Sequence, residues 1–156
     1  MAARLGVDIG RARVGIACCD SEATLAYPIE TVQRSASTDL DELGARIAAL
    51  AREYECERIY VGLPLNLRGE RTLSTEDALD CARRISTHTG LPVFLQDERF
   101  TTNIAAQQLR PSGRKRARSR QVIDQAAAVA ILQSALEVEQ RTGAPAGTPI
   151  EAYTDV

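Results

Sequence analysis

The sequence predicts an α/β protein in which helices flank one mixed five-stranded sheet, and three observations lead to that prediction. Three short apolar runs fill the first third of the chain, with only brief breaks between them. From about residue 39 onward, stretches with helical periodicity alternate with further apolar runs. No internal repeat or linker interrupts the 156 residues, which can bury a sizeable core as one domain. The tight early breaks favour an antiparallel meander, and the later alternation favours parallel strands joined by right-handed crossovers.

Each expected element has its own local signal. The break at 10–13 is short enough for a hairpin turn, and Thr38 or Asp39 can cap the helix that follows the third strand. Gly90 is a helix-ending signal. The expected strands are 5–9, 14–19, 25–32, 58–63 and 92–96, and the expected helices are 39–55, 74–87, 101–109 and 119–141. Residues 1–141 form the predicted domain, and the Gly-, Pro-, Thr- and Ala-rich stretch 142–156 is predicted to be a disordered tail.

Composition narrows the class of protein. No apolar run approaches the roughly 18 residues of a membrane span, and the start of the chain carries no signal-peptide pattern, so a cytoplasmic location is expected. The four cysteines lack the paired spacing of a zinc site, and the only histidine, His88, falls in a polar helix end. Free thiols are expected in a reducing cytosol. Cys18 and Cys19 are adjacent in a predicted strand and point to opposite faces, so one of them is expected to be buried.

Three carboxylates stand where a strand or a helix meets a loop. Asp8 interrupts the apolar run 5–10, Glu98 follows the run 91–96, and Asp124 falls in the first turns of a strongly apolar helix. A charge in such a place is costly unless it is paired or bound to a metal. Ligands of such a sheet collect beyond the carboxyl ends of the parallel strands. The three side chains are therefore expected to converge there on a divalent cation.

Each of these acids also has a structural alternative. Asp8 can cap the turn that follows it, as aspartate often does before glycine. Glu98 can be a surface acid that pairs with Arg99, and Asp124 can stabilise its helix through the helix dipole. The coincidence of all three acids favours the metal site.

The net charge of −2 hides a basic segment. Six basic residues and no acids lie between Arg110 and Arg120, and without these six charges the rest of the chain carries −8. A run of like charges is often only a solvated loop, but this one lies beside the predicted metal site, which favours contact with nucleic acid. The chain has no Trp and two Phe, so such contact should rest on backbone charge and shape and not on base stacking.

Four segments together resemble the YqgF/RuvX family of Holliday-junction-resolvase-like proteins, which lies within the ribonuclease H superfamily and is also described as a family of candidate pre-16S rRNA nucleases. The segments are Asp8 to Gly15, Val61 to Asn66, Asp97 to Thr102 and Ile123 to Ala127, in order within about 5–136. Arg68 departs from the family, which usually has an acid or a small polar residue at that point.

The resemblance implies a metal-dependent nuclease with the sheet order 3-2-1-4-5. In that order one strand separates Asp8 from Glu98, so Glu98 would need its full side-chain length, or a bend at Arg99, to reach a shared metal. Asp8, Glu98 and Asp124 are the expected catalytic and metal-binding residues, with Mg2+ or Mn2+ as the cofactor. The expected contacts to nucleic acid are Arg11, Arg13, Asn66, Arg99, Arg114, Lys115 and Arg116. The expected substrate is a four-way DNA junction, as in DNA recombination, or precursor ribosomal RNA, as in ribosome biogenesis, and a homodimer is an expected assembly on a junction.

Two other functions remain open at this stage. An ATP-binding phosphotransferase can use the same fold and the same turn after Asp8, although a single domain without a second lobe weighs against it. A nuclease-like scaffold can bind RNA in ribosome maturation without cutting it, although three intact carboxylates weigh against that function. Metal-dependent hydrolysis needs no side-chain base, which suits a chain whose one histidine falls in a polar helix end.

Overall fold

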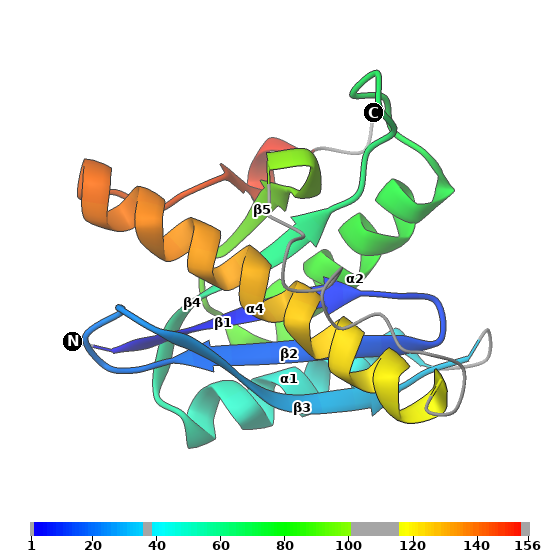
Figure 1. Cartoon of the computed structure of the whole chain (residues 1–156), viewed down its shortest axis with the longest axis horizontal. Helices are drawn as coiled ribbons and strands as arrows, with labels where there is room; N and C mark the ends of the chain where they lie inside the picture. Colours follow the sequence, from blue (N-terminus) through cyan, green and yellow to red (C-terminus); the bar gives the residue numbers. More distant parts are fainter. Residues whose placement is uncertain (1, 36–38, 101–115, 154–156) are drawn as a thin grey trace.

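The computed structural model confirms the mixed α/β fold, with helices on both faces of one sheet (Figure 1). It describes residues 2–35, 39–100 and 116–153, apart from the side chains of residues 100 and 116–124. The strands are β1 Ala3–Ile9, β2 Arg13–Cys19, β3 Ala26–Gln33, β4 Cys56–Leu63, β5 Val93–Asp97 and β6 Thr148–Pro149. The helices are α1 Leu40–Glu53, α2 Leu73–Thr89 and α4 Arg116–Thr142, with 3-10 turns η1 at Glu98–Phe100 and η3 at Ile150–Ala152. Within the described ranges, no helix has the length and apolar character needed to cross a membrane.

The strands lie in the order β3-β2-β1-β4-β5-β6, which confirms the expected order 3-2-1-4-5 and adds a sixth strand. The first three strands form the expected antiparallel meander, whereas β4 and β5 run parallel to β1. Val7 of β1 pairs with Val61 of β4, and Val61 pairs in turn with Leu95 of β5. The carboxyl ends of these three parallel strands therefore lie at one edge of the sheet, close to Asp8 and Glu98.

The sixth strand corrects the prediction of a disordered tail. After α4 the described chain returns to the sheet, and β6 pairs antiparallel with β5. Ala146 and Ile150 are only 2% and 6% exposed, and the Ala146 N–H donates to the Tyr60 hydroxyl at 3.2 Å. Two buried side chains within a Gly- and Pro-rich stretch give no periodic signal, which is why the sequence does not reveal this docking. Residues 143–153 are thus packed against the domain.

The last helix begins earlier than the sequence predicts. α4 starts at Arg116 and not at 119, so the end of the basic segment is helical. Arg and Ala are both good helix formers, which explains the extension. The helix expected at 101–109 lies outside the described residues, and so do Arg114 and Lys115.

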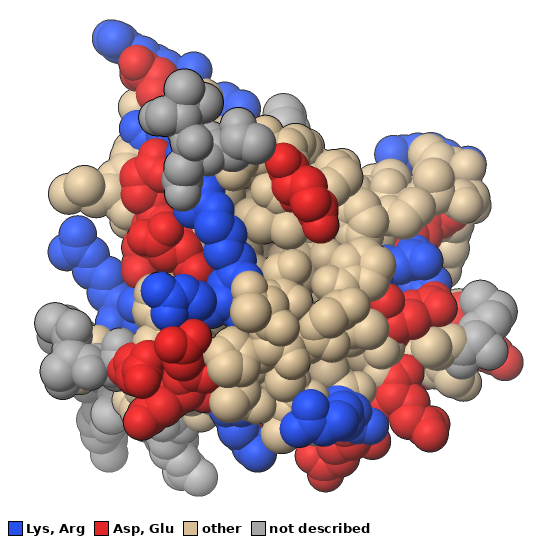
Figure 2. Space-filling model, turned by 180° about the vertical axis from the view of Figure 1, so that it is seen from behind, with Lys and Arg blue, Asp and Glu red and all other residues tan. Residues whose placement is uncertain are grey.

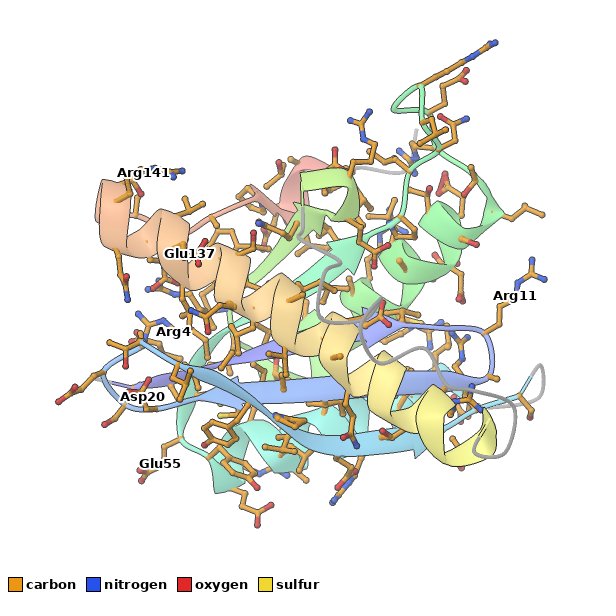
Figure 3. The ribbon with its side chains drawn as sticks, viewed as in Figure 1. Arg4, Arg11, Asp20, Glu55, Glu137 and Arg141 are labelled. Atoms are coloured by element: carbon orange, nitrogen blue, oxygen red, sulfur yellow. The ribbon has the colours of Figure 1, made fainter. Side chains whose placement is uncertain are left out.

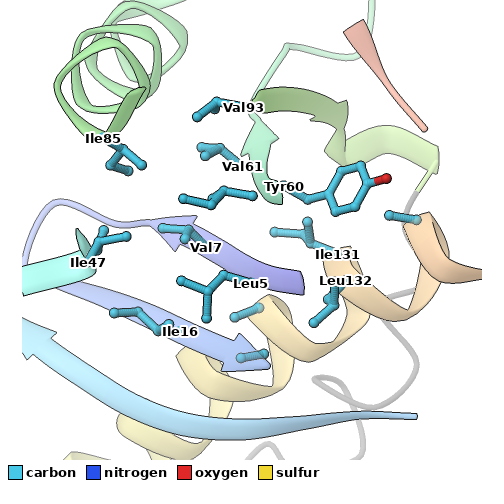
Figure 4. Close-up of a cluster of buried hydrophobic side chains, with 14 of the residues drawn as sticks. Leu5, Val7, Ile16, Ile47, Tyr60, Val61, Ile85, Val93, Ile131 and Leu132 are labelled. Carbon is cyan, nitrogen blue, oxygen red and sulfur yellow. The ribbon is translucent and has the colours of Figure 1, made fainter. Parts of the chain in front are cut away.

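The core has two layers, one on each face of the sheet. α1 and α2 pack against each other on one face, where Ile47 and Ile85 lie around Val7 (Figure 4). α4 crosses β1 and β2 on the other face, where it buries Ile131 and Leu132 (Figures 1 and 4). Because side chains alternate along a strand, each core strand contributes to both layers. Both faces of the sheet are therefore occupied, and polar chemistry is confined to its ends.

Both faces of β2 are covered by helices, which decides the state of the cysteines. Cys18 and Cys19 are both buried, whereas the sequence predicts one buried residue on the assumption that a strand has one wet face. All four cysteines are free thiols. Burial raises the pKa of the Cys19 thiol to about 11, so this group is protonated at neutral pH.

Candidate active site

Asp8 stands near the carboxyl end of β1, on the face of the sheet that α4 covers. The orientation of this face follows from Gly6, where a Cβ would lie 2.6 Å from Leu132 Cβ and 2.8 Å from the Ala128 carbonyl of α4. Residues two apart in a strand share a face, so Asp8 points to the same side, one step nearer the end of the strand. The Asp8 side chain is half-buried there.

Glu98 reaches the same place from the end of β5. It is the first residue of η1, and its carboxylate lies over Gly62 of β4. A Cβ at Gly62 would lie 2.5 Å from Glu98 Oε1 and 3.1 Å from Glu98 Cδ. Since Val7 pairs with Val61, Gly62 is the neighbour of Asp8 in the intervening strand. A glycine at this position therefore gives the Glu98 carboxyl room to cross β4.

The two carboxyl groups meet, and Glu98 forms a hydrogen bond with Asp8. Burial is the main influence on Glu98 and raises its pKa; the hydrogen bond with Asp8 acts in the opposite direction, and the nearby charge of Asp97 raises the pKa further. A hydrogen bond between two carboxyl groups requires a proton on one of them. The pair is thus a concentrated acidic site that a shared proton or a bound cation would stabilise.

The third predicted ligand, Asp124, is described only in its backbone. It lies in α4, one helical turn before Ala128, whose carbonyl faces Gly6 of β1. This turn of α4 is on the same face of the sheet as Asp8 and Glu98. The side chain of Asp124 lies outside the described part of the chain. Among the described side chains the site is accordingly a pair, and no group of three or more potential metal ligands is found among them.

The donor set suits a hard divalent cation. Carboxylate oxygens are the ligands that Mg2+ and Mn2+ prefer, and a bound cation would offset both the burial of Glu98 and its proximity to Asp8. The sulfur and imidazole ligands of the chain lie elsewhere: the cysteines are in the core, and His88 pairs with Asp41 of α1 at 3.1 Å. The residues present thus fit magnesium or manganese better than zinc.

Arg99 contacts both the end of β5 and the loop between β4 and α2. Its Nη2 pairs with Asp97 Oδ2 at 2.8 Å, and this pairing lowers the pKa of Asp97. The guanidinium also lies against the loop between β4 and α2, where a Cβ at Gly69 would be 2.9 Å from Arg99 Nη1. The structural alternative that pairs Glu98 with Arg99 therefore gives way to two other pairs, Arg99 with Asp97 and Glu98 with Asp8.

Asn66 organises the same loop. Its Oδ1 accepts hydrogen bonds from the backbone N–H groups of Arg68 and Glu70, at 3.0 and 2.9 Å, and its Nδ2 donates to Glu70 Oε1 at 3.1 Å. Both ends of the amide are engaged within the loop. Asn66 thus has a structural role beside the site, and Arg68 is carried outward on the exposed part of this loop.

The predicted basic contacts are spread over both sides of the sheet end. Arg11 extends from the turn between β1 and β2 (Figure 3), and Arg13 is the first residue of β2. Arg11 lines a pocket on the α2 side, away from the face that carries Asp8 and Glu98. Arg116 is described only in its backbone, at the start of α4.

Two functional features escaped the sequence analysis. Gly62 belongs to a segment that was recognised for its similarity, but only its position beneath Glu98 shows why a larger residue would be harmful. Arg34 follows β3 and reads as an ordinary surface arginine, yet its side chain is buried against Asp77 of α2. The distance in sequence between Arg34 and Asp77 leaves no local signal for this pair.

The strand order, with helices on both faces of the sheet, defines a ribonuclease H-like fold. Solved structures with this fold include the RuvC protein of T. thermophilus in complex with a Holliday junction substrate. Its TM-score is 0.60 at 18% identity, over 96% of this chain and 99% of that one. The fowlpox virus Holliday junction resolvase has a TM-score of 0.51 at 12% identity, over 87% of this chain and 99% of that one.

Sequence comparison places the chain in a particular family. The RuvX family model, described as Holliday junction resolvase, matches residues 2–138, so the chain belongs to this family of nucleases. Proteins from Clavibacter michiganensis subsp. michiganensis and Mycobacterium tuberculosis, each named "Putative pre-16S rRNA nuclease", are both 47% identical to it. The matches cover 94% and 93% of this chain, and 90% and 83% of the two relatives.

Proposed function

We propose that this protein is a metal-dependent endonuclease that hydrolyses phosphodiester bonds in structured nucleic acid. The observation that carries the proposal is the meeting of the Asp8 and Glu98 carboxyls across Gly62. Two acids at the ends of strands that are not adjacent are held together in a partly buried place. Burying and pairing like charges costs free energy, and a purely structural role gives no reason for that cost. This arrangement favours catalysis over a scaffold that only binds RNA.

Asp8, Glu98 and Asp124 would together hold one or two Mg2+ or Mn2+ ions. When bound, such ions activate water for in-line attack and stabilise the leaving 3′-oxygen. The protein's own contribution is to fix the carboxylates: Gly62 leaves room for Glu98, and both groups are partly shielded from bulk water. The site needs no imidazole base, in keeping with the pairing of His88 to Asp41 of α1.

Basic residues outside the carboxylate pair would hold the substrate. The proposed contacts to backbone phosphates are Arg11, Arg13, Arg114, Lys115 and Arg116. Arginine binds phosphate well, and a contact to phosphate carries no information about the base sequence. Asn66 and Arg99 would act on nucleic acid mainly by positioning the loop between β4 and α2, since their polar groups are engaged there.

The substrate class follows from the family and from the named relatives. The family description points to a four-way DNA junction, and the relatives' names point to precursor 16S rRNA. Both are structured and rich in duplex, which suits recognition by backbone charge and shape. Resolution of a junction requires two symmetric cuts, so a homodimer would form at least on that substrate. Processing of ribosomal RNA would place the protein in the cytoplasm.

A panel of labelled substrates tests this function. A four-way DNA junction, precursor 16S rRNA, and linear duplexes of matched length are incubated with the protein and Mg2+ or Mn2+, with EDTA as control. We expect metal-dependent cleavage of one structured substrate and slower cleavage of the linear duplexes. Tight binding of precursor rRNA without cleavage under any metal condition would instead support the non-catalytic scaffold.

A further inference from the structure

A pocket of about 410 Å³ opens at the same end of the sheet as the carboxylate pair, but on the α2 side. Its lining residues come from the β1–β2 turn, the end of β3 and the first turns of α2: Arg11, Arg34, Ser35, Leu73, Ser74 and Asp77. Figure 2 shows this edge on the left, where basic and acidic side chains alternate. The pocket is separate from the metal site, which faces α4.

Arg34 forms the inner wall of this pocket. Its side chain is 9% exposed, and its Nη1 and Nη2 donate to the two Asp77 carboxylate oxygens at 2.8 and 3.0 Å. Nη1 also donates to the Gly10 carbonyl at 3.0 Å. Its Nε is buried and lacks a hydrogen-bond partner among the described residues. The guanidinium also lies beside the buried Cys81 thiol of α2, so Arg34 is a cation held in a fixed position on the inner wall of the pocket.

The start of α2 forms the opposite wall. Thr72 caps this 17-residue helix, and Leu73 and Ser74 are its first two residues. The first backbone N–H groups of a helix have no acceptor within it, and the helix dipole adds partial positive charge at this end. The Thr72 side chain accepts from the N–H of Thr75 at 3.4 Å. This cap does not involve the N–H groups of Leu73 and Ser74, which can therefore donate only to acceptors outside the helix.

Arg11 gives the pocket its net positive charge. Among the residues that line the pocket, Asp77 is balanced by Arg34, which leaves the positive charge of Arg11 and of the helix end. Arg11 is exposed and stands on the turn between β1 and β2 (Figure 3). An exposed arginine, a buried arginine and a helix N-terminus around one cavity form a site for a compact, multiply oxygenated anion.

We propose that this pocket binds a backbone phosphate of the nucleic acid at a position removed from the bond that is cut. The inference rests on the proposed nuclease function and names a second point of contact for the same substrate. Arg34 connects the two places, because it holds the carbonyl of Gly10, two residues beyond Asp8. A strand that passes around this end of the sheet contacts the carboxylates on the α4 face and this pocket on the α2 face.

The pocket itself is tested with inorganic phosphate and the metal-free protein. Backbone amide NMR signals of Leu73 and Ser74 should shift and saturate as phosphate is added. The shifts should be lost in Arg11→Gln and kept in Arg141→Gln, which makes the same charge change at the far end of α4 (Figure 3). Absence of saturable shifts in the wild type, or equal shifts in Arg11→Gln, would overturn the anion site.

Assignment of the pocket to nucleic acid is tested by binding a four-way DNA junction in EDTA at several salt concentrations. Arg11→Gln should lower the slope of log affinity against log salt by about 0.9, the contribution of one phosphate contact on duplex DNA. Arg141→Gln should leave the slope unchanged. If phosphate binds but the Arg11→Gln slope equals the wild-type slope, the pocket serves another anion and this assignment is wrong. If the pocket passes both tests but no substrate is cleaved with metal, the nuclease function fails and the phosphate site stands.

Discussion

The carboxylate of Glu98 lies directly over Gly62, with its Oε1 2.5 Å from where a Cβ of residue 62 would be. The glycine is buried in the strand between β1 and β5, so its missing side chain is the space through which Glu98 reaches Asp8. Assembly of the acidic pair thus depends on a residue that carries no functional group.

Gly62→Ala should therefore separate the acids without removing either of them. The new methyl group would overlap Glu98 Oε1 and the Ile131 Cδ1, which lies 2.6 Å from the same position. We expect cleavage to fall at least tenfold and stability to fall by about 1–3 kcal/mol, as for overpacked cores. Cleavage is measured well below the melting temperature of the variant.

Gly90→Ala is the matched control for this change. Gly90 ends α2 with φ of 67° and has open space around its Cβ position, so alanine there adds backbone strain without touching the site. It should cost about 1 kcal/mol and leave cleavage at the wild-type rate. Equal cleavage by Gly62→Ala and Gly90→Ala would show that Glu98 does not need the space over Gly62.

The acidic pair should also make stability depend on pH when no metal is bound. Burial raises the pKa of Glu98 in the folded protein above its ordinary value of 4.5, so the folded state binds this proton more tightly than the unfolded state. The resulting stabilisation is complete below pH 4.5 and is lost as pH rises through the folded pKa. In EDTA at pH 8, Glu98→Gln should therefore melt at a higher temperature than the wild type, with little difference at pH 4.

Thermal unfolding followed by circular dichroism measures this effect, with about 2–4 °C expected for each kcal/mol in a domain of this size. Glu137→Gln, at an exposed position of α4, serves as the control and should follow the wild type (Figure 3). Mn2+ should raise the melting temperature of the wild type at pH 8 and raise that of Glu98→Gln much less, since binding to the folded state stabilises it. Identical pH profiles for the wild type and Glu98→Gln would contradict the account of the pair.

The C-terminal segment should contribute to stability, contrary to what its composition suggests. Truncation after Gly143 removes β6 and the buried Ala146 and Ile150. We expect a loss of more than about 2 kcal/mol in the free energy of unfolding, because burial of one isoleucine side chain alone contributes about 1.5–3 kcal/mol. Urea unfolding measures the loss. Leu67→Ala is the control: this side chain is 97% exposed, so the free energy of unfolding should change by no more than about 0.5 kcal/mol. If the truncation has an effect as small as that of Leu67→Ala, the segment does not dock on the domain.

The basic segment should act on affinity and not on folding. Replacement of Arg114, Lys115 and Arg116 by Ala should weaken binding to every nucleic-acid sequence about equally, because phosphate contacts carry no base information. On duplex DNA the salt slope should fall by up to roughly 3, at about 0.9 for each lost contact. Fluorescence anisotropy at several salt concentrations measures both quantities. Wild-type affinity and slope in the folded triple variant would identify the segment as a solvated loop.

Local patterns in the sequence predict the order of elements along the chain and the place of two of the three acids, whereas the strand order 3-2-1-4-5 comes from the resemblance to the family. Apolar runs, turns and helical periodicity set the order of elements, and parallel strands then bring the ends of β1 and β5 to one edge. Asp8 and Glu98 follow from that topology. What the sequence does not show is how Glu98 crosses β4, because the path depends on the 3-10 turn that starts at Glu98 and on the empty space over Gly62.

The features that sequence reasoning missed depend on contacts between distant segments. Ile150 docks beside β5 although nothing around it in the sequence is periodic. Arg34 pairs with Asp77, which is 43 residues away in sequence, and this pairing buries its side chain in the wall of a pocket. For Asn66, the sequence suggests a contact to nucleic acid, whereas the hydrogen bonds within the loop favour a structural role.

If Asp8 and Glu98 form the centre of a metal-dependent nuclease, then removal of the Asp8 charge should abolish cleavage without abolishing substrate binding. Single-turnover cleavage of the preferred substrate is measured with saturating Mn2+ for the wild type, Asp8→Asn and Asp20→Asn. Asp20 is an acid after the end of β2, at the opposite end of the molecule from Arg11 and the β1–β2 turn (Figure 3). We expect Asp8→Asn to lose at least about 100-fold in rate, which corresponds to about 2.7 kcal/mol of transition-state stabilisation. Substrate binding should persist in Asp8→Asn, and Asp20→Asn should cleave like the wild type. Cleavage by a folded Asp8→Asn protein at the wild-type rate would contradict this role of the acidic pair.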